Sequence, residues 1–384
     1  MPLTQPRQGG DPQLPFECVA LLLQGGGALG AYQAGVCEGL AEAHIVPNWV
    51  AGISIGAINA AIIAGSPPDK RVDHLRRFWR QVTRDAPTAW PKGFLKGDWS
   101  RRFVSRMSAG MAMTNGVPGF FVPRLPFPWL YPTGAIEATS FYDTASLKST
   151  LEGLIDFDRI NSGGMRFSVG AVNVRTGNFV YFDTATHRIR PEHVMASGAL
   201  PPGFPAVEID GEFYWDGGLV SNTPLNWVMD SVPRQDTLAF QVDLWSARGD
   251  FPGNLAEVET RRKEIQYSSR TRASTDQFKY AQRVRNSVAC LLDDLPDDMK
   301  NHPAVELLRP IADRKAYNLV HLIYRASTYE GYSKDYEFSR RSMEMHWRTG
   351  YHDTVRTLRH PQILERPRDA EGVAIFDLDH DGRE

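Results

Sequence analysis

The stretch Gln24–Gly30, with the sequence QGGGALG, follows the apolar run Val19–Leu23, and a second glycine turn, Gly52–Gly56 (GISIG), follows Trp49–Ala51. Each turn stands where a strand is expected to pass into a helix. A strand, a helix and a second strand in this order predict parallel pairing of the two strands. Residues 18–65 therefore indicate an α/β fold with a mainly parallel sheet.

The second turn places Ser54 in the pattern G-x-S-x-G. In this pattern the flanking glycines let the strand and the helix approach closely around a strained serine, whose hydroxyl is pushed out of the turn. The almost wholly apolar residues 57–64 predict a short helix that ends at Gly65. Its free N–H groups and positive dipole end favour negative charge near the serine. Taken alone, the pentapeptide is equally compatible with an ordinary strand-to-helix turn.

The first turn also matches G-x-G-x-x-G through Gly25, Gly27 and Gly30. A dinucleotide-binding fold needs an acidic residue about 20 positions further on, at the end of the second strand. Residues 46–54 contain no acidic residue, and no Gly-Lys-Ser/Thr follows the glycines as in a phosphate-binding loop. We interpret the loop as a set of backbone N–H donors for an oxyanion.

A third motif, Asp216-Gly217-Gly218, follows the β-prone residues Phe213–Trp215. An isolated Asp-Gly-Gly sequence is usually a plain turn. Beside a reactive serine, however, a carboxylate can accept the hydroxyl proton. The motif therefore makes Asp216 the candidate base.

Together these motifs resemble the patatin-like phospholipase family, over roughly residues 18–245, and the segment Ala196–Pro205 is similar to the family's approach to its aspartate. The resemblance implies a three-layer α/β/α domain and a Ser–Asp dyad without histidine, in which Ser54 is the nucleophile and Asp216 the base. Many members carry Lys or Arg where this chain has Leu29. The implied oxyanion hole is Gly25, Gly26, Gly27 and Ala28, and the motif-supporting glycines are Gly30, Gly52, Gly56, Gly217 and Gly218.

We expect a lipid acyl hydrolase that cleaves carboxylic esters of phospholipids or related lipids through an acyl-serine intermediate. A hydrolase of storage polyester or acyl oligomers needs the same dyad and a different pocket. A non-catalytic acyl-binding scaffold has no need of both Ser54 and Asp216. A Ser–Asp–His triad is a further alternative, with the candidates His187, His193, His321, His346 and His352.

Composition bounds the possible partners. The 384 residues include 43 basic and 45 acidic side chains, so no overall field favours nucleic acid or an anionic membrane. We expect a lipid or other acyl ester as partner, with transient membrane-surface contact. Three scattered cysteines, Cys18, Cys37 and Cys290, favour neither disulfides nor zinc, and Asp377–Gly382 imitates only half of a calcium loop. We therefore expect no metal or cofactor. With no signal-peptide pattern and no apolar run of about 18 residues, a cytoplasmic protein is expected.

The chain divides into a disordered lead (1–17), a catalytic domain (18–245) and a largely helical extension packed on the core (246–384). Residues 86–140 form an insert with many large apolar side chains, which we interpret as a lid and acyl-binding segment over the dyad; an irregular segment packed on the sheet is the alternative. Apolar residues at 99, 103 and 107 predict a helix with an interface-seeking stripe. Further strands are expected at 166–174, 179–182, 238–244 and 318–324, and helices at 75–82, 144–154, 255–292 (an ordinary solvated helix) and 334–358.

Overall fold

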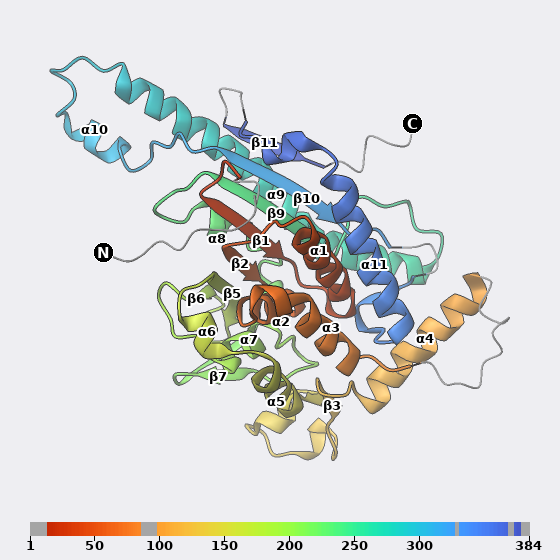
Figure 1. The fold of residues 1–384 in the computed structure, drawn as a ribbon. Helices are drawn as coiled ribbons and strands as arrows, with labels where there is room; N and C mark the ends of the chain where they lie inside the picture. The colour runs from red at the N-terminus through yellow and green to blue at the C-terminus, as the bar shows by residue number, and fades with distance from the viewer. Residues whose placement is uncertain (1–13, 86–97, 327–329, 368–371, 378–384) are drawn as a thin grey trace.

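A nine-stranded sheet organises the computed structural model, which describes residues 14–85, 98–326, 330–367 and 372–377 (Figure 1). The order of its strands is β11-β10-β9-β1-β2-β5-β8-β7, and β6 pairs with β5. The strands are β1 (Cys18–Leu23), β2 (Trp49–Gly52), β5 (Arg166–Asn173), β6 (Phe179–Asp183), β7 (Val207–Ile209), β8 (Glu212–Asp216), β9 (Thr237–Asp243), β10 (Tyr317–Ile323) and β11 (Val373–Phe376). From β11 to β5 every neighbouring pair is parallel, as residues 18–65 predict.

The side chains of β1 point alternately to the two faces of the sheet, and both faces are covered by helices. Val19, Leu21 and Leu23 belong to a core cluster with the helices α1 (Ala31–Glu42) and α2 (Ile55–Ala64). Cys18, Ala20 and Leu22 face the opposite cluster, which includes residues of α8 (Leu225–Met229) and α9 (Leu255–Asp293). Because successive side chains of a strand point to opposite faces, one apolar strand fills both cores. The result is a three-layer α/β/α arrangement.

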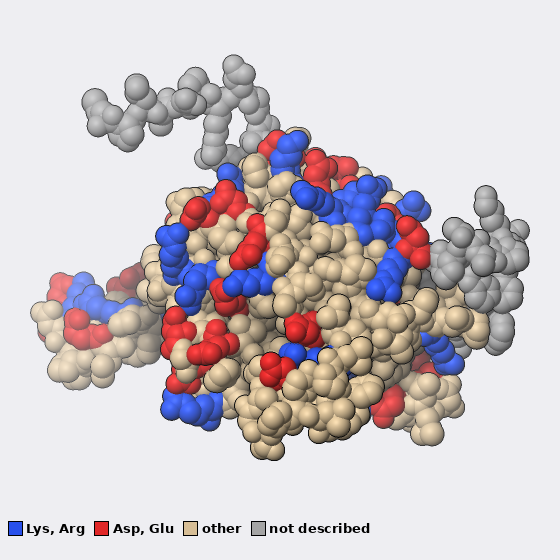
Figure 2. Space-filling model, turned by 90° about the horizontal axis from the view of Figure 1, so that it is seen from below, with Lys and Arg blue, Asp and Glu red and all other residues tan. Residues whose placement is uncertain are grey.

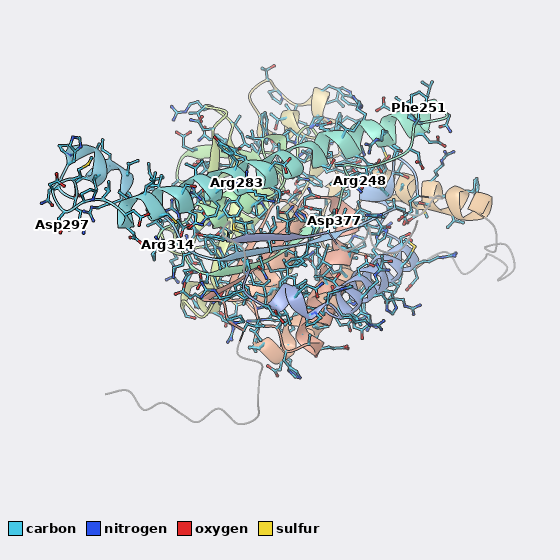
Figure 3. The ribbon with its side chains drawn as sticks, turned by 90° about the horizontal axis from the view of Figure 1, so that it is seen from above. Arg248, Phe251, Arg283, Asp297, Arg314 and Asp377 are labelled. Carbon is cyan, nitrogen blue, oxygen red and sulfur yellow. The ribbon has the colours of Figure 1, made fainter. Side chains whose placement is uncertain are left out.

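The C-terminal region continues the same sheet. The strand β10 pairs with β9 and β11 pairs with β10, both in parallel. The helix α11 (Arg340–Thr357) packs on α1, where Tyr32 donates to Asp353 at 2.9 Å and Tyr351 donates to Glu42 at 2.7 Å. The long helix α9 crosses the other face, and the segment that carries Asp297 projects beyond the body (Figure 3).

The predicted elements are largely confirmed, with two differences. The helix expected over 334–358 begins only at Arg340, because Ser339 caps it by accepting from the N–H of Ser342 at 3.2 Å. The helix expected near 99–107 is longer, and as α4 it spans Asp98–Asn115. The other elements are α3 (Arg71–Gln81), β3 (Val122–Pro123), β4 (Tyr142–Asp143), α5 (Ala145–Leu154), α6 (Phe157–Asn161), α7 (Pro191–Ser197) and α10 (Pro303–Leu308).

Three predictions fall partly outside the described residues: the lead at 1–13, the start of the insert at 86–97, and the calcium-like tail from 378 onward. Among the residues that the structure does describe, no helix is both long enough and apolar enough to cross a membrane.

Candidate active site

Ser54 occupies a strained turn between β2 and α2. Its φ of 56° is one of three positive values among the described non-glycine residues. The flanking glycines are required by close packing: a Cβ on Gly52 would lie 2.3 Å from the carbonyl oxygen of Gly56, and a Cβ on Gly56 would lie 2.2 Å from that of Leu23. The backbone N–H of Ser54 donates to Ser197 Oγ at 3.0 Å. This is the geometry expected of an elbow that presents its hydroxyl.

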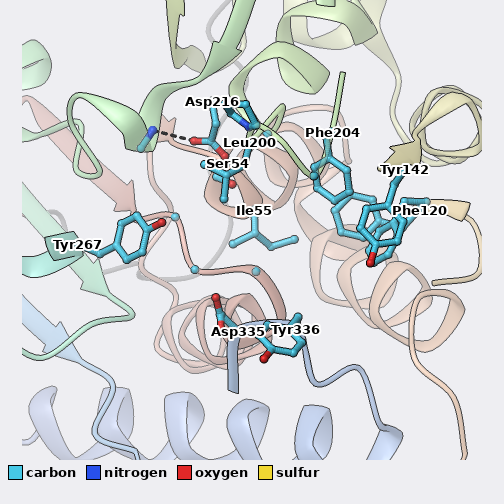
Figure 4. Close-up of a pocket in the computed structure, with 18 of the residues that line it drawn as sticks. Ser54, Ile55, Phe120, Tyr142, Leu200, Phe204, Asp216, Tyr267, Asp335 and Tyr336 are labelled. Atoms are coloured by element: carbon cyan, nitrogen blue, oxygen red, sulfur yellow. Dashed lines mark hydrogen bonds between the residues drawn. The ribbon is translucent and has the colours of Figure 1, made fainter. Parts of the chain in front are cut away.

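Strand register brings Asp216 to the serine. The strand β6 occupies one edge of β5, so β2 and β8 share the other edge. Along that edge Gly52 pairs with Val169 and, two residues further, Asp216 pairs with Ala171. Since β2 runs parallel and β8 antiparallel to β5, their carboxyl ends meet. The side chains of Ser54 and Asp216 consequently face each other (Figure 4).

The environment of Asp216 changes its acidity. The residue is 2% exposed, and this burial raises the pKa of its carboxyl to about 7. Hydrogen bonding to the Ser54 side chain and to the N–H of Gly218, at 2.7 Å, opposes the rise. The desolvated carboxylate is disfavoured relative to its acid, which makes it a stronger base than an exposed aspartate. A carboxylate of ordinary pKa near 4 is a poor base.

The loop of Gly25 to Ala28 runs beside the serine. An added Cβ on Gly25 would lie 3.0 Å from the Cβ of Ser54, so the backbone of Gly25 lies directly against the serine side chain. Gly27 has a φ of 56°, and within the described residues the N–H groups of Gly26 and Gly27 donate to no protein acceptor. Donors held in this way beside a serine are available to an oxyanion. Leu29, the departure from many family members, is fully buried in the core.

Buried polar side chains brace this loop, and the sequence analysis did not single them out. Gln24 Oε1 accepts from the N–H groups of Leu244, at 2.7 Å, and Trp245, at 3.1 Å. The carbonyl of Gly25 accepts from Asn222 Nδ2 at 3.0 Å and from Trp245 Nε1 at 2.9 Å. These hydrogen bonds connect the loop to the residues that follow β9 and to the residues that follow the Asp216 turn. The sequence offered one sign of this support: Gln24 directly precedes the glycine loop, and Asn222 shortly follows Asp216-Gly217-Gly218.

A largely apolar pocket of about 440 Å³ opens over Ser54 and Asp216. One wall is an aromatic cluster in which Phe121 contacts Tyr142 and Phe204, with ring centroids 4.8 and 5.1 Å apart. Figure 4 shows Tyr142 and Phe204 on this side of the pocket. The insert contributes several lining residues: Ala112, Met113, Phe120 and Phe121. The pocket therefore combines a hydroxyl, a carboxyl and a surface suited to an apolar chain.

The C-terminal region supplies the opposite wall. Its lining residues there are Tyr267, Tyr332, Asp335, Tyr336 and Phe338. Lys263 donates to both carboxylate oxygens of Asp335 at 2.9 Å and lies 3.9 Å from the ring centre of Tyr332. Burial raises the pKa of Asp335, and the charge of Lys263 opposes this rise. The prediction of an ordinary solvated helix at 255–292 was wrong at this point, since the side chain of Lys263 is only 15% exposed.

The candidate triad histidines lie elsewhere. Among the described residues that line the pocket there is no histidine. His321 contacts Asp243 at 3.4 Å, and His346 contacts Glu330 at 2.6 Å. His193 accepts from the N–H of Arg190 at 2.9 Å, and burial lowers its pKa to about 4. These histidines have structural partners of their own, which favours the dyad.

Comparisons with known proteins match two parts of the chain. A family model described as patatin-like phospholipase matches residues 21–228, and a second, described as patatin phospholipase, matches residues 265–370. A comparison with curated proteins gave no significant match. Among solved structures, the crystal structure of VipD from Legionella pneumophila is similar, with 15% identity, a TM-score of 0.41, and 93% of this chain and 72% of VipD covered. That likeness is too distant to bear on the site.

Proposed function

The chain belongs to the patatin-like phospholipase family, which supports lipid acyl hydrolase activity in general, and we propose that it cleaves carboxylic esters of phospholipids or related lipids with a Ser54–Asp216 dyad. One observation carries the proposal. The hydroxyl of Ser54, whose backbone is strained, faces the buried carboxyl of Asp216 at the end of an apolar pocket. Neither a plain turn nor a scaffold requires a strained serine and a desolvated carboxyl in contact.

The first half-reaction forms an acyl-serine. Asp216 accepts the hydroxyl proton while Ser54 Oγ attacks the ester carbonyl. The negative charge that develops on the carbonyl oxygen is held by N–H groups of residues 25–28, each worth about 3 kcal/mol in comparable sites. The carbon–oxygen bond of the ester then breaks, and the proton on Asp216 passes to the departing alcohol. The acyl group remains on Ser54.

The second half-reaction reverses these roles with water. Asp216, ionised again, accepts a proton from a water molecule that attacks the acyl-serine carbonyl. The same N–H groups stabilise the second tetrahedral intermediate. Collapse of this intermediate releases the carboxylic acid, and the proton returns to Ser54 Oγ.

A second cavity supports a substrate with a polar head. This cavity, of about 1170 Å³, shares Tyr332 and Tyr336 with the apolar pocket. Its lining includes four arginines and four acidic residues: Arg106, Arg248, Arg261, Arg325, Asp250, Glu257, Glu264 and Glu330. Arginine presents several donors in a geometry that suits phosphate oxygens. An ester with an apolar acyl chain and a polar head that contains a phosphate would use both cavities, which favours a phospholipid over a polyester without a head group.

A covalent probe and a substrate panel test the proposal together. A fluorophosphonate should label the wild-type protein at Ser54, and Ser54→Ala should be folded but unlabelled. The matched control is Ser162→Ala, an exposed serine whose hydroxyl donates to its own helix at 2.7 Å. Turnover of phospholipids above that of hydroxyacyl oligomers supports the phospholipid assignment, and the reverse supports the polyester alternative. Labelling of Ser54→Ala, or no turnover of any ester, contradicts the dyad.

A further inference from the structure

An exposed apolar projection connects β3 to β4, and we call residues 122–141 the apolar finger. Its large apolar side chains are 40–77% exposed, which is unusual for so many neighbours in one short segment. They are Val122, Leu125, Phe127, Trp129, Leu130, Ile136 and Phe141. The rings of Phe127 and Trp129 stack with their centres 4.9 Å apart. The finger thus holds an organised apolar surface in contact with water.

The finger carries almost no charge. Its charged side chains are Arg124 and Glu137. The side chain of Arg124 is 9% exposed and donates inward to Ser140 Oγ at 3.0 Å and to Asp143 at 3.4 Å. Figure 2 views the molecule from the side on which the finger lies, and a broad area there shows neither basic nor acidic residues. Attraction between charges is therefore not what this surface offers a partner.

The finger begins where the lining of the catalytic pocket ends. Phe121 and Tyr142 line the pocket, while their chain neighbours Val122 and Phe141 are 49% and 48% exposed on the surface. The base of the finger is bonded to the pocket wall, because the N–H groups of Phe141 and Tyr142 donate to the carbonyls of Pro202 and Gly203 at 3.0 and 2.9 Å. The base of the finger is consequently part of the wall of the pocket that contains Ser54.

We propose that the apolar finger docks the enzyme on a lipid surface, so that an acyl chain passes from the lipid into the pocket without crossing water. The inference rests on the proposed function, because a lipid hydrolase must meet a substrate that is held in an aggregate. Trp129 and Phe127 are of the residue types that prefer the boundary between lipid and water. With no exposed basic residue on the finger, docking depends on apolar contact and accepts zwitterionic lipid.

Binding is measured with vesicles of ether-linked phosphatidylcholine, which have no carboxylic ester to hydrolyse. The full-length wild-type protein should sediment with these vesicles at both 0.1 M and 0.5 M NaCl. For the double variant Trp129→Ser/Leu130→Ser, the partition coefficient between vesicles and water should fall at least about tenfold. The matched control is Tyr280→Ser/Leu307→Ser, which removes an aromatic and an aliphatic side chain that are 69% and 76% exposed elsewhere and line neither cavity. The control should bind as the wild type does.

A soluble ester separates docking from chemistry. Hydrolysis of p-nitrophenyl butyrate below its solubility limit should be equal in the wild type and the finger variant, whereas hydrolysis of ester-linked vesicles should fall with binding. If the protein binds the ether vesicles but hydrolyses no ester, docking stands and the proposed function fails. Equal vesicle binding by the finger variant overturns the inference. So does binding that requires anionic lipid and vanishes in salt, or a wild-type dimer that the finger variant dissociates into monomers.

Discussion

Lys263, on α9, holds Asp335 by both carboxylate oxygens at 2.9 Å, and the backbone of Asp335 lies directly against Gly27 of the glycine loop. An added Cβ on Gly27 would come within 2.1 Å of the Asp335 carbonyl oxygen. The ion pair therefore fixes a segment that supports the loop from the side opposite Ser54. Through this contact the C-terminal region shapes the site without supplying a reacting group.

Lys263→Met should misplace the loop. We expect kcat for a soluble ester to fall about tenfold while KM changes little, because the lost support affects an oxyanion more than a bound ester. The free energy of unfolding should fall by ~2 kcal/mol, since the carboxylate of Asp335, only 21% exposed, loses charged hydrogen bonds. Steady-state kinetics and urea unfolding measure the two effects. Lys263→Arg is the conservative control and should retain most of the wild-type kcat. Equal kcat values for Lys263→Met and the wild type would refute the role of Lys263 in supporting the loop.

The pKa of Asp216 sets the pH dependence of turnover. Burial raises this pKa to about 7, and the carboxyl must be ionised to accept the serine proton. We expect kcat/KM to be low at pH 5, to rise with a midpoint near pH 7, and to level off above pH 8. A profile on a soluble ester measures this midpoint. A midpoint near pH 4 would mean that the carboxyl is not desolvated in solution.

Asp216→Asn should have opposite effects on activity and stability. Turnover should fall on the order of 10³-fold, because the amide cannot accept the proton. The pKa in the unfolded chain is about 3.9 and that in the folded protein is higher, so the carboxyl favours folding below pH 4 and loses that contribution as pH rises through 7. Between pH 5 and pH 8 the wild type should lose about 2 to 3 kcal/mol relative to the variant. Chemical denaturation of both proteins at the two pH values provides the test, and an unchanged difference would contradict it.

Filling the pocket should restrict acyl-chain length. Ala112 on α4 is 6% exposed and lines the pocket, so Ala112→Trp places a large side chain where an acyl chain would lie. We expect hydrolysis of octanoyl and longer p-nitrophenyl esters to fall at least about tenfold more than that of the acetyl ester, through lost apolar contact. Gly110→Leu, at a position where an added Cβ meets no atom within 4 Å, is the control. An equal loss on short and long esters would place the acyl chain elsewhere.

The motifs around Ser54 and Asp216 could be recognised from sequence because each depends on local chain geometry. Glycines at 52 and 56 and the apolar helix behind the serine leave a signature in consecutive residues. The alternation of strands and helices likewise predicted the parallel sheet. The strand register that brings Ser54 and Asp216 together could not be predicted from the sequence, since it depends on how β5 pairs with β2 and β8.

Long-range support of the site was missed for the same reason. Lys263 stands among charged residues of a helix, a pattern typical of a solvated face. Its burial depends on Asp335 and Tyr332, which are distant in sequence and adjacent only in the folded chain. The segment at 334–339 was predicted to be the first part of the final helix, which begins only at Arg340. Its 3-10 turn, Lys334–Tyr336, instead lies against the glycine loop, a contact that no local pattern encodes.

The continuous sheet has a consequence for the order of events during synthesis. Since β10 completes the pairing of β9, and the segment around Asp335 supports Gly27, a nascent chain that has reached only the aspartate turn holds both Ser54 and Asp216 but lacks one wall of the pocket. Maturation of the glycine loop must wait for residues beyond 335 to leave the ribosome. Both motif residues would therefore be in place before the pocket around them has its second wall.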